Sequence, residues 1–280
     1  MDFATIAGLI IGFGAVFFAG WVGGTDPHIV FGRYEAIILI IAGTLGATIT
    51  SFPLRTFVRG FFGGFRTAFV EVNYHERDVI STLVSFAEKA RREGLLALEN
   101  EAAALDDEFM RKGIQLVIDG RDTEIIRKVL ETEVSNTQEL GSKAEAVFTC
   151  MGGYSPTLGI IGTVLGLIGM LRGLASLGAS TNVAGTIGVA TAQAFVATFF
   201  GIMLANLLWL PIGTKIKERN AQLLLLREIM IEGILAIQAG DNPRLLEEKL
   251  LAFLDPRERE TEIEEGGHVA TEPGFSGSGA

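Results

Sequence analysis

Several residue types that serve enzymatic or metal chemistry are scarce in this chain. Among its 280 residues are a single cysteine, Cys150, and three dispersed histidines. One cysteine excludes an intrachain disulfide and a cysteine-based metal cage. The sequence also lacks an H-E-x-x-H, a G-x-S-x-G and a Walker A motif. We therefore expect no enzymatic activity, no bound metal and no organic cofactor.

Basic residues are also too few for a nucleic-acid partner. The chain has 23 lysines and arginines against 33 aspartates and glutamates, for a formal net charge of −10. Nucleic-acid binding needs a basic surface. We exclude this partner class.

Charged residues are missing altogether from four long stretches, in a chain whose mean hydropathy is +0.40. A helix that crosses the hydrocarbon core of a lipid bilayer needs about 20 apolar residues. The uncharged stretches run over Phe3–Thr25, Ala36–Leu54, Ala146–Leu171 and about Thr186–Thr214. The sequence predicts an all-α, polytopic membrane protein with four transmembrane helices and a helical cytoplasmic domain between helices 2 and 3.

Lysine and arginine beside the spans predict their orientation, because these residues favour cytoplasmic loops. The basic residues at the ends assigned to the cytoplasm are Arg55, Arg59, Arg66, Lys143, Lys215, Lys217 and Arg219, whereas the outer hairpins carry only Arg33 and Arg172. Both termini should be cytoplasmic. No A-x-A site follows the first apolar stretch, so we expect the first helix to be retained.

These spans divide the chain into five parts. We predict a transmembrane hairpin at 1–54, a cytoplasmic helical domain at 55–145 and a second transmembrane hairpin at 146–214. Cytoplasmic C-terminal helices follow at 215–255. The last part, 256–280, is rich in charge, Gly, Ser and Thr, and this composition predicts a disordered tail.

Apolar periodicity predicts helices within the soluble parts. An amphipathic helix is expected over Asp78–Ala104 with Asp78 as its cap, and a second over Glu108–Ile118. A third should start near Asp122 and continue as one rod into the third span, since no strong helix breaker intervenes. After the fourth span we expect a helix to Ala239 and a short one ending near Leu254.

The four spans contain no ionisable residue near the bilayer centre, although intramembrane proton relays depend on such groups. If the protein moves ions, another subunit must supply the titrating carboxylate. The spans do contain closely spaced glycines, which let helices approach closely. Pro156 and Pro211 are either static kinks or hinges. Thr163 and Thr198 either bond carbonyls of their own helices or face a partner's carboxylate.

Three segments resemble a known family, the A subunit of the bacterial flagellar stator (the MotA and PomA group). Residues 152–166, GGYSPTLGIIGTVLG, resemble the family's pattern around a membrane proline. Residues 194–201, AFVATFFG, and the stretch on to Pro211 are similar to its last span, and 91–99, RREGLLALE, to its charged cytoplasmic segment.

The resemblance implies a function. It implies a ring of five A subunits around two helices of a MotB-like B subunit, whose membrane aspartate binds the ion, in the inner membrane of a bacterial cell. Ion flow would turn this ring against a FliG-like rotor switch protein. Arg91 and Glu99 match the family's rotor-facing charges, and Pro156 and Pro211 match its two functionally important prolines.

The transported ion follows from the same resemblance. It places Thr163, Ala197 and Thr198 along the ion pathway, where sodium-type members carry two adjacent threonines in the last span. Ala197 replaces one of these hydroxyl ligands of a hard cation. We therefore expect protons, while Thr163 leaves sodium open.

Two other interpretations remain open. One is an energiser of outer-membrane transport that resembles ExbB or TolQ, although that group usually has three spans. The other is a membrane scaffold that conducts no ions, which would explain the glycines but not the paired prolines.

Overall fold

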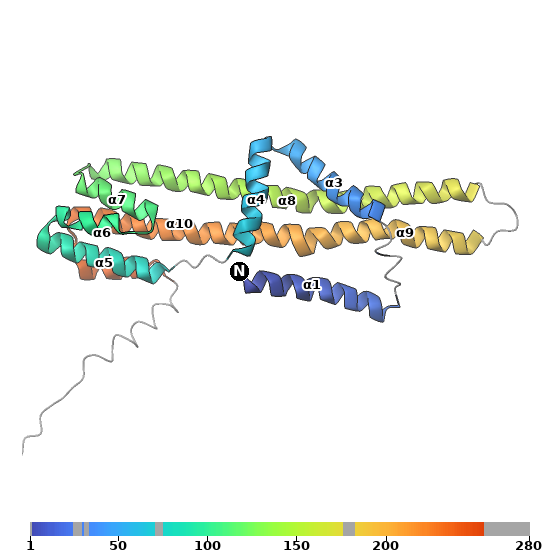
Figure 1. Ribbon diagram of the computed structural model, residues 1–280, viewed down its shortest axis with the longest axis horizontal. Helices are drawn as coiled ribbons and strands as arrows, with labels where there is room; N and C mark the ends of the chain where they lie inside the picture. Colours follow the sequence, from blue (N-terminus) through green and yellow to red (C-terminus); the bar gives the residue numbers. More distant parts are fainter. Residues whose placement is uncertain (1, 25–29, 31–33, 71–74, 176–182, 255–280) are drawn as a thin grey trace, which may run out of the picture. The chain divides into compact units, whose positions relative to one another are not determined.

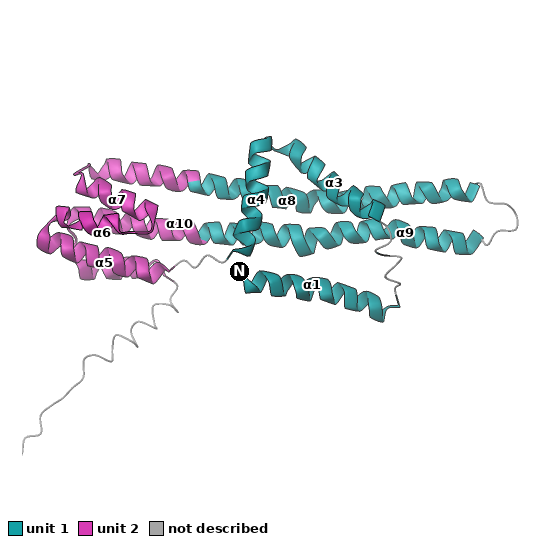
Figure 2. Ribbon diagram, in the orientation of Figure 1, with its two compact units in different colours: residues 1–73, 137–221 teal, residues 74–136, 222–280 magenta. Residues whose placement is uncertain are grey.

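The computed structural model describes residues 2–24, 30, 34–70, 75–175 and 183–254, and these residues fold almost entirely into helices, with no strand among them (Figure 1). This confirms the predicted all-α fold class. The chain divides into two compact units, each made from two separate stretches (Figure 2). Unit 1 comprises residues 1–73 and 137–221, and unit 2 comprises residues 74–136 and 222–280. The predicted tail, 256–280, lies outside the described residues.

Unit 1 holds the long apolar helices. Its elements are α1 (Phe3–Val22), α3 (Tyr34–Ser51), α4 (Leu54–Phe69), the second part of α8 (Thr123–Ala175), α9 (Val183–Leu204), the π-helical segment η2 (Ala205–Trp209) and the start of α10 (Leu210–Ala239). Among the described residues, four helical stretches are long and apolar enough to cross a membrane: α1, α3, α8, and α9 continued through α10. They coincide with the four predicted spans, and the crossing itself stays a prediction.

Helix α1 shows why these helices need an apolar environment. None of its residues is buried within the chain. Its exposed side chains include Phe3 at 83%, Ile11 at 70% and Trp21 at 74%. An apolar surface of this extent is typical of contact with lipid or with other subunits.

Helix α4 was not predicted as a separate element, and it begins directly after the second apolar helix. Pro53 lies at its N-terminal cap position and cannot donate a backbone hydrogen bond there. Its buried residues are Phe57, Gly60, Gly64 and Ala68. Phe57 and Ala68 join an apolar cluster with Phe148 of α8 and Ile216 of α10. Helix α4 therefore packs within unit 1. The predicted domain boundaries, which assign each segment to the membrane or to the cytoplasm, remain predictions.

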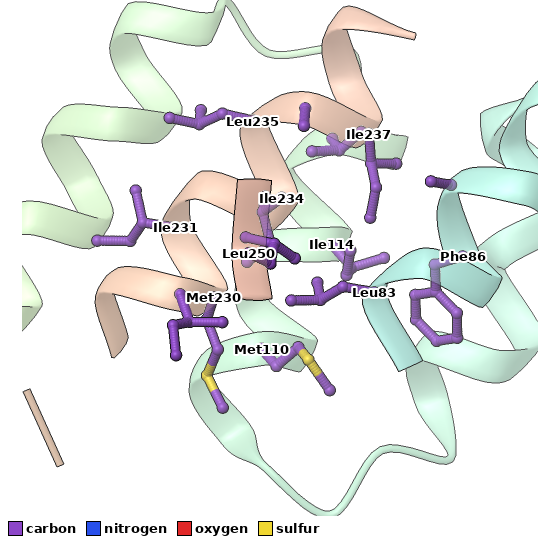
Figure 3. Packing of buried hydrophobic residues seen from close by; sticks show 14 of the residues in the cluster. Leu83, Phe86, Met110, Ile114, Met230, Ile231, Ile234, Leu235, Ile237 and Leu250 are labelled. Atoms are coloured by element: carbon purple, nitrogen blue, oxygen red, sulfur yellow. The ribbon is translucent and has the colours of Figure 1, made fainter. Parts of the chain in front are cut away.

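Unit 2 is a helical bundle around one apolar core. Its elements are α5 (Glu76–Glu93), the 3-10 helix η1 (Leu95–Leu98), α6 (Glu99–Ala103), α7 (Glu108–Ile118), the first part of α8, the rest of α10 and α11 (Pro243–Leu251). Figure 3 shows where these helices meet: Leu83 of α5, Ile114 of α7, Ile234 of α10 and Leu250 of α11 point toward one another, and all four are 0% exposed.

The predicted helix over Asp78–Ala104 is wrong in two respects. The chain leaves the helix at Gly94, whose φ of 88° suits glycine, and continues as η1 and α6. The helix also starts earlier, at Glu76 with His75 as its cap, so Asp78 lies inside the first turn. Periodicity continued across Gly94 because Leu98 and Ala102 join the same core.

The other predicted helices are confirmed. Helix α7 has the predicted bounds, and Asp107 caps it by accepting a hydrogen bond from the backbone N–H of Met110 at 2.8 Å. Helix α8 is one continuous helix of 53 residues. Helix α10 ends at Ala239, before Gly240 with a φ of 73°, and Pro243 starts the last short helix.

Candidate functional site

The candidate site lies where α8 and α9 cross at very short range. A methyl group added to Gly159 would lie 2.9 Å from the carbonyl oxygen of Ala197, and one added to Gly201 would lie 2.7 Å from the carbonyl oxygen of Ser155. Only glycine at both positions permits this approach. The crossing brings the residues of the predicted ion pathway together.

Two threonine hydroxyls connect the helices at this crossing. The Oγ1 atoms of Thr163 and Thr198 lie 2.5 Å apart. Thr163 also lies within hydrogen-bonding distance of the carbonyl oxygens of Gly159 and Ala194, both at 3.1 Å. Thr198 reaches the Gly159 carbonyl at 3.3 Å. The hydroxyls thus bond to both helices, rather than each to its own helix alone.

Ala197 lies beside this pair and is 3% exposed. It lines a cavity of about 650 Å³ between α3, α8 and α9, together with Gly162, Gln193 and Glu35. The structure therefore brings Thr163, Ala197 and Thr198 into one place, next to an open space. It gives position 197 no oxygen ligand.

A further hydroxyl at the crossing was missed in the sequence. Ser155 is fully buried and donates to the carbonyl oxygen of Gly201 at 2.9 Å. Its signal was its place directly before Pro156, inside the segment that carries the family resemblance. Buried hydroxyls that bond across two helices hold their register.

The two prolines have different surroundings. Pro156 lies inside α8, which continues through it without a break. Pro211 follows η2, where the N–H of Leu210 donates to the carbonyl oxygen of Ala205, five residues earlier. Proline at 211 has no N–H to offer the preceding turn, and a wider turn accommodates its ring. Whether either proline acts as a hinge stays a proposal.

The predicted rotor-facing charges lie in unit 2. Arg91 is in the last turn of α5 and Glu99 starts α6, so the break at Gly94 separates them. Both are exposed. Neighbouring Glu101 forms an ion pair with Lys89, with Nζ and Oε1 2.5 Å apart. This hydrogen bond raises the pKa of Lys89. No ion pair engages Arg91 or Glu99 within the described part of the chain.

An ion cluster at the start of α1 was also missed. The Asp2 carboxylate accepts from Lys215 and Arg219 of α10, and the Arg219 guanidinium also donates to the carbonyls of Thr67 and Val70. The hydrogen bond from Lys215 lowers the pKa of Asp2 well below its ordinary range. No local pattern indicates this contact, because 217 positions separate Asp2 from Arg219.

Metal ligands do not cluster in the described ranges, where no group of three or more His, Cys, Asp or Glu side chains is positioned to hold an ion. The site therefore consists of small and hydroxyl side chains between two apolar helices. It offers close packing and two hydroxyl groups, and the ionisable side chain among the residues that line the adjoining cavity is Glu35, in the first turn of α3.

Comparison with known proteins shows what this chain is similar to. Residues 101–229 match the model of the MotA/TolQ/ExbB proton channel family. Motility protein A of Treponema phagedenis is 36% identical over 94% of this chain and 98% of its own length. The structure of the flagellar MotAB stator complex from Bacillus subtilis matches with a TM-score of 0.82 and 35% identity, over 92% of this chain and 98% of the other. The structure of C. jejuni MotAB matches with a TM-score of 0.84 and 28% identity, over the same shares of the two chains.

Proposed function

This chain belongs to the MotA/TolQ/ExbB proton channel family and is a stator A subunit of a flagellar motor, and from that premise we propose that it couples inward proton flow to torque on the rotor. The observation that carries the proposal is the crossing of α8 and α9, where Thr163, Ala197 and Thr198 meet and none of the three is ionisable. A channel subunit built in this way guides an ion that another group binds.

The titrating carboxylate belongs, in our proposal, to a MotB-like B subunit. The ionisable residues that border the apolar stretches of α3 and α8 are Glu35, in the first turn of α3, and Glu145 and Arg172, on either side of the apolar part of α8. All three lie at the ends of the apolar stretches rather than at mid-span. The similar structures from Bacillus subtilis and C. jejuni are of MotAB complexes. A carboxylate from the B subunit would fill the role that this chain leaves open.

Protons are the proposed ion, and the argument rests on position 197. A hard cation prefers several oxygen ligands. Here the hydroxyls of Thr163 and Thr198 bond to each other and to backbone carbonyls, and Ala197 adds no oxygen. Sodium is the less favoured alternative because the threonine pair still offers lone pairs.

Assembly and orientation complete the proposal. The chain is a membrane protein, and we propose a multi-pass arrangement in the bacterial inner membrane with both termini cytoplasmic. Five copies would form a ring around two B-subunit helices, with Arg91 and Glu99 presented to a FliG-like rotor protein. The apolar surface of α1 supports contacts with other chains and lipid, and so do Gly153 and Gly169, where an added methyl group would meet nothing within 4 Å.

Swimming speed tests the choice of ion. The chain and its cognate B subunit are expressed in a motile cell that lacks its own stator, and speed is measured after sodium is removed at fixed pH and then after a protonophore is added. We expect swimming to survive sodium removal and to stop with the protonophore. Loss of swimming on sodium removal would instead identify a sodium stator.

The variant Ala197→Thr sharpens this test. Ala197 lines the cavity, so the added hydroxyl can extend into this space. We expect a measurable sodium dependence to appear in the variant and not in the parent. Ala197→Ser is the matched variant, because it adds the same oxygen without the extra methyl group. If both variants swim as the parent does at every sodium concentration, position 197 does not determine the ion.

A further inference from the structure

Helix α4 has two contrasting faces. Its inner face packs so closely that a methyl group on Gly60 would lie 3.1 Å from Val147, and one on Gly64 would lie 2.4 Å from the ring of Phe148. The rings of Phe61 and Phe148 stack with their centroids 5.9 Å apart. The inner face is therefore fixed on α8, and the outer face is exposed in the part of the chain that the structure describes.

Three arginines project from the outer face. At about 100° per residue, Arg55, Arg59 and Arg66 fall within an arc of about 40°, opposite the buried glycines. All three are exposed. Helix α4 contains no aspartate or glutamate. No ion pair to these guanidinium groups occurs in the described parts of the chain, so their charges are not neutralised there.

An apolar stripe runs beside the arginines. Leu54, Val58 and Phe62 follow one another at intervals of four residues and are 64%, 42% and 67% exposed. Side chains at this spacing lie on one side of a helix. A purely aqueous environment would not favour such a stripe, whereas a helix lying in a membrane interface uses apolar and basic side chains next to each other.

The position of α4 agrees with an interface. It starts three residues after the last residue of the apolar helix α3. Within unit 1 it runs across α8 and α10 rather than along them (Figure 1). If α8 crosses the bilayer, a helix that runs across α8 lies along the membrane surface.

From these observations we propose that the outer face of α4 binds the headgroups of anionic phospholipids. Arg55, Arg59 and Arg66 contact the phosphates, and Leu54, Val58 and Phe62 enter the boundary of the acyl chains. The planar guanidinium group pairs well with phosphate oxygens. The inference goes beyond the proposed function. The two share one assumption, that the C-terminal end of α3 lies at the cytoplasmic leaflet, whose lipids are anionic.

A bilayer fits this face better than a protein does. Three unpaired arginines within one arc need several anions in one plane, and the adjacent stripe needs apolar contact at the same depth. An anionic bilayer surface supplies both along the whole length of the helix, about 24 Å for 16 residues. A protein partner would need an acidic and an apolar stripe in matching register.

The test uses the complete stator complex, purified with its B subunit in mild detergent and stripped of lipid. The complex is titrated with phosphatidylglycerol or with phosphatidylcholine of the same acyl chains, and its unfolding midpoint and the lipid retained per complex are measured. We expect phosphatidylglycerol to raise the midpoint and to be retained more than phosphatidylcholine. In R55Q/R59Q/R66Q the preference should fall roughly fivefold for each arginine removed.

Two matched variants keep the test interpretable. R92Q/R121Q/R244Q removes the same charge from exposed positions of unit 2 and should keep the full lipid preference. Replacing Arg55, Arg59 and Arg66 with lysine retains the charge and should keep most of it. An equal response to the two lipids in the parent, or an undiminished preference in the glutamine variant, would overturn the proposal.

A protein interface would give a different result. In that case the glutamine variant would lower the mass of the complex and its unfolding midpoint equally with either lipid, and the lipid assignment would be wrong. Ion flow is not measured in this experiment. Its outcome is therefore independent of whether the stator conducts protons.

Discussion

At the scale of single residues, Asp2 makes more tertiary contacts than its place in the sequence suggests. Its backbone N–H donates to the carbonyl of Phe69 at 3.0 Å, and its carboxylate caps α1 by accepting from the N–H of Thr5 at 3.0 Å. The same carboxylate neutralises Lys215 and Arg219. Asp2 thus connects the start of α1 with the end of α4 and with two residues in the first half of α10.

We expect Asp2→Asn to lower the unfolding free energy by about 2 kcal/mol at neutral pH, because Arg219 would lose a charged partner in a buried position. The pKa of Asp2 is lowered by folding, so its contribution is full above its ordinary value of about 3.9 and declines as the pH falls toward the lowered value. The difference between parent and variant should therefore be full at pH 5 and shrink as the pH is lowered below about 4, as read from unfolding midpoints in detergent.

Asp241→Asn is a suitable control for this experiment. It removes a carboxylate that is exposed and that forms no ion pair with the residues described. It should leave the midpoint unchanged within about 0.5 kcal/mol at either pH. An Asp2→Asn variant as stable as the parent at neutral pH would show that the cluster contributes nothing to folding.

At the scale of elements, the crossing of α8 and α9 depends on backbone contact. We expect Gly159→Ala to lower stability by about 1–3 kcal/mol, because the added methyl group meets a carbonyl oxygen and two Cα atoms that cannot move aside separately. Gly188→Ala, in α9 but with nothing within 4 Å of the added carbon, should be tolerated. Unfolding midpoints of the purified chain compare the two, and equal midpoints would contradict the assignment of this contact.

The sequence correctly predicted the helices whose ends or continuity depend on a local sequence signal. The end of α7 was predicted because the Asp119-Gly120 pair follows it, and α8 was predicted because no strong helix breaker interrupts it. Helix α4 was missed because it follows α3 after a turn of two residues, and nearly all of its residues fell within the stretch assigned to the cytoplasmic domain. The break at Gly94 was missed because the apolar period continues across it.

The candidate site was predictable only in part. Thr163, Ala197 and Thr198 came from the family resemblance, and the close contact of their helices follows from the glycines. The role of Ser155 depends on which carbonyl of α9 it meets. The Asp2 cluster depends on helices distant in sequence. Such contacts are set by tertiary packing, on which local sequence has little influence.

At the scale of the whole molecule, torque would depend on exposed charges that form no ion pair among the described residues. We expect Arg91→Glu and Glu99→Arg to reduce the torque of single motors without releasing the B subunit, because both side chains are exposed and neither supports the core of unit 2. Tethered-cell rotation measures torque, and co-purification of the B subunit measures assembly. Arg121→Glu, also exposed in unit 2, is the matched control.

Normal rotation in the variant with both reversals would remove Arg91 and Glu99 from the rotor contact. Loss of the B subunit in either single variant would instead indicate a role in assembly. A third result, rescue of one reversal by a complementary reversal on the rotor protein, would identify the facing residue.

The π-helical segment at Ala205–Trp209 also determines how the residues that follow it are rotated about the helix axis. One additional residue in that turn rotates all that follows by about 100° relative to an uninterrupted α-helix. With this rotation of α10, Ile212, Ile216 and Arg219 face their partners. Deletion of one residue here would therefore act as a rotation, turning the entire 30-residue helix α10 away from its contacts, while a substitution at the same place would alter one side chain. Among relatives, we expect the length of this segment to vary less than its composition.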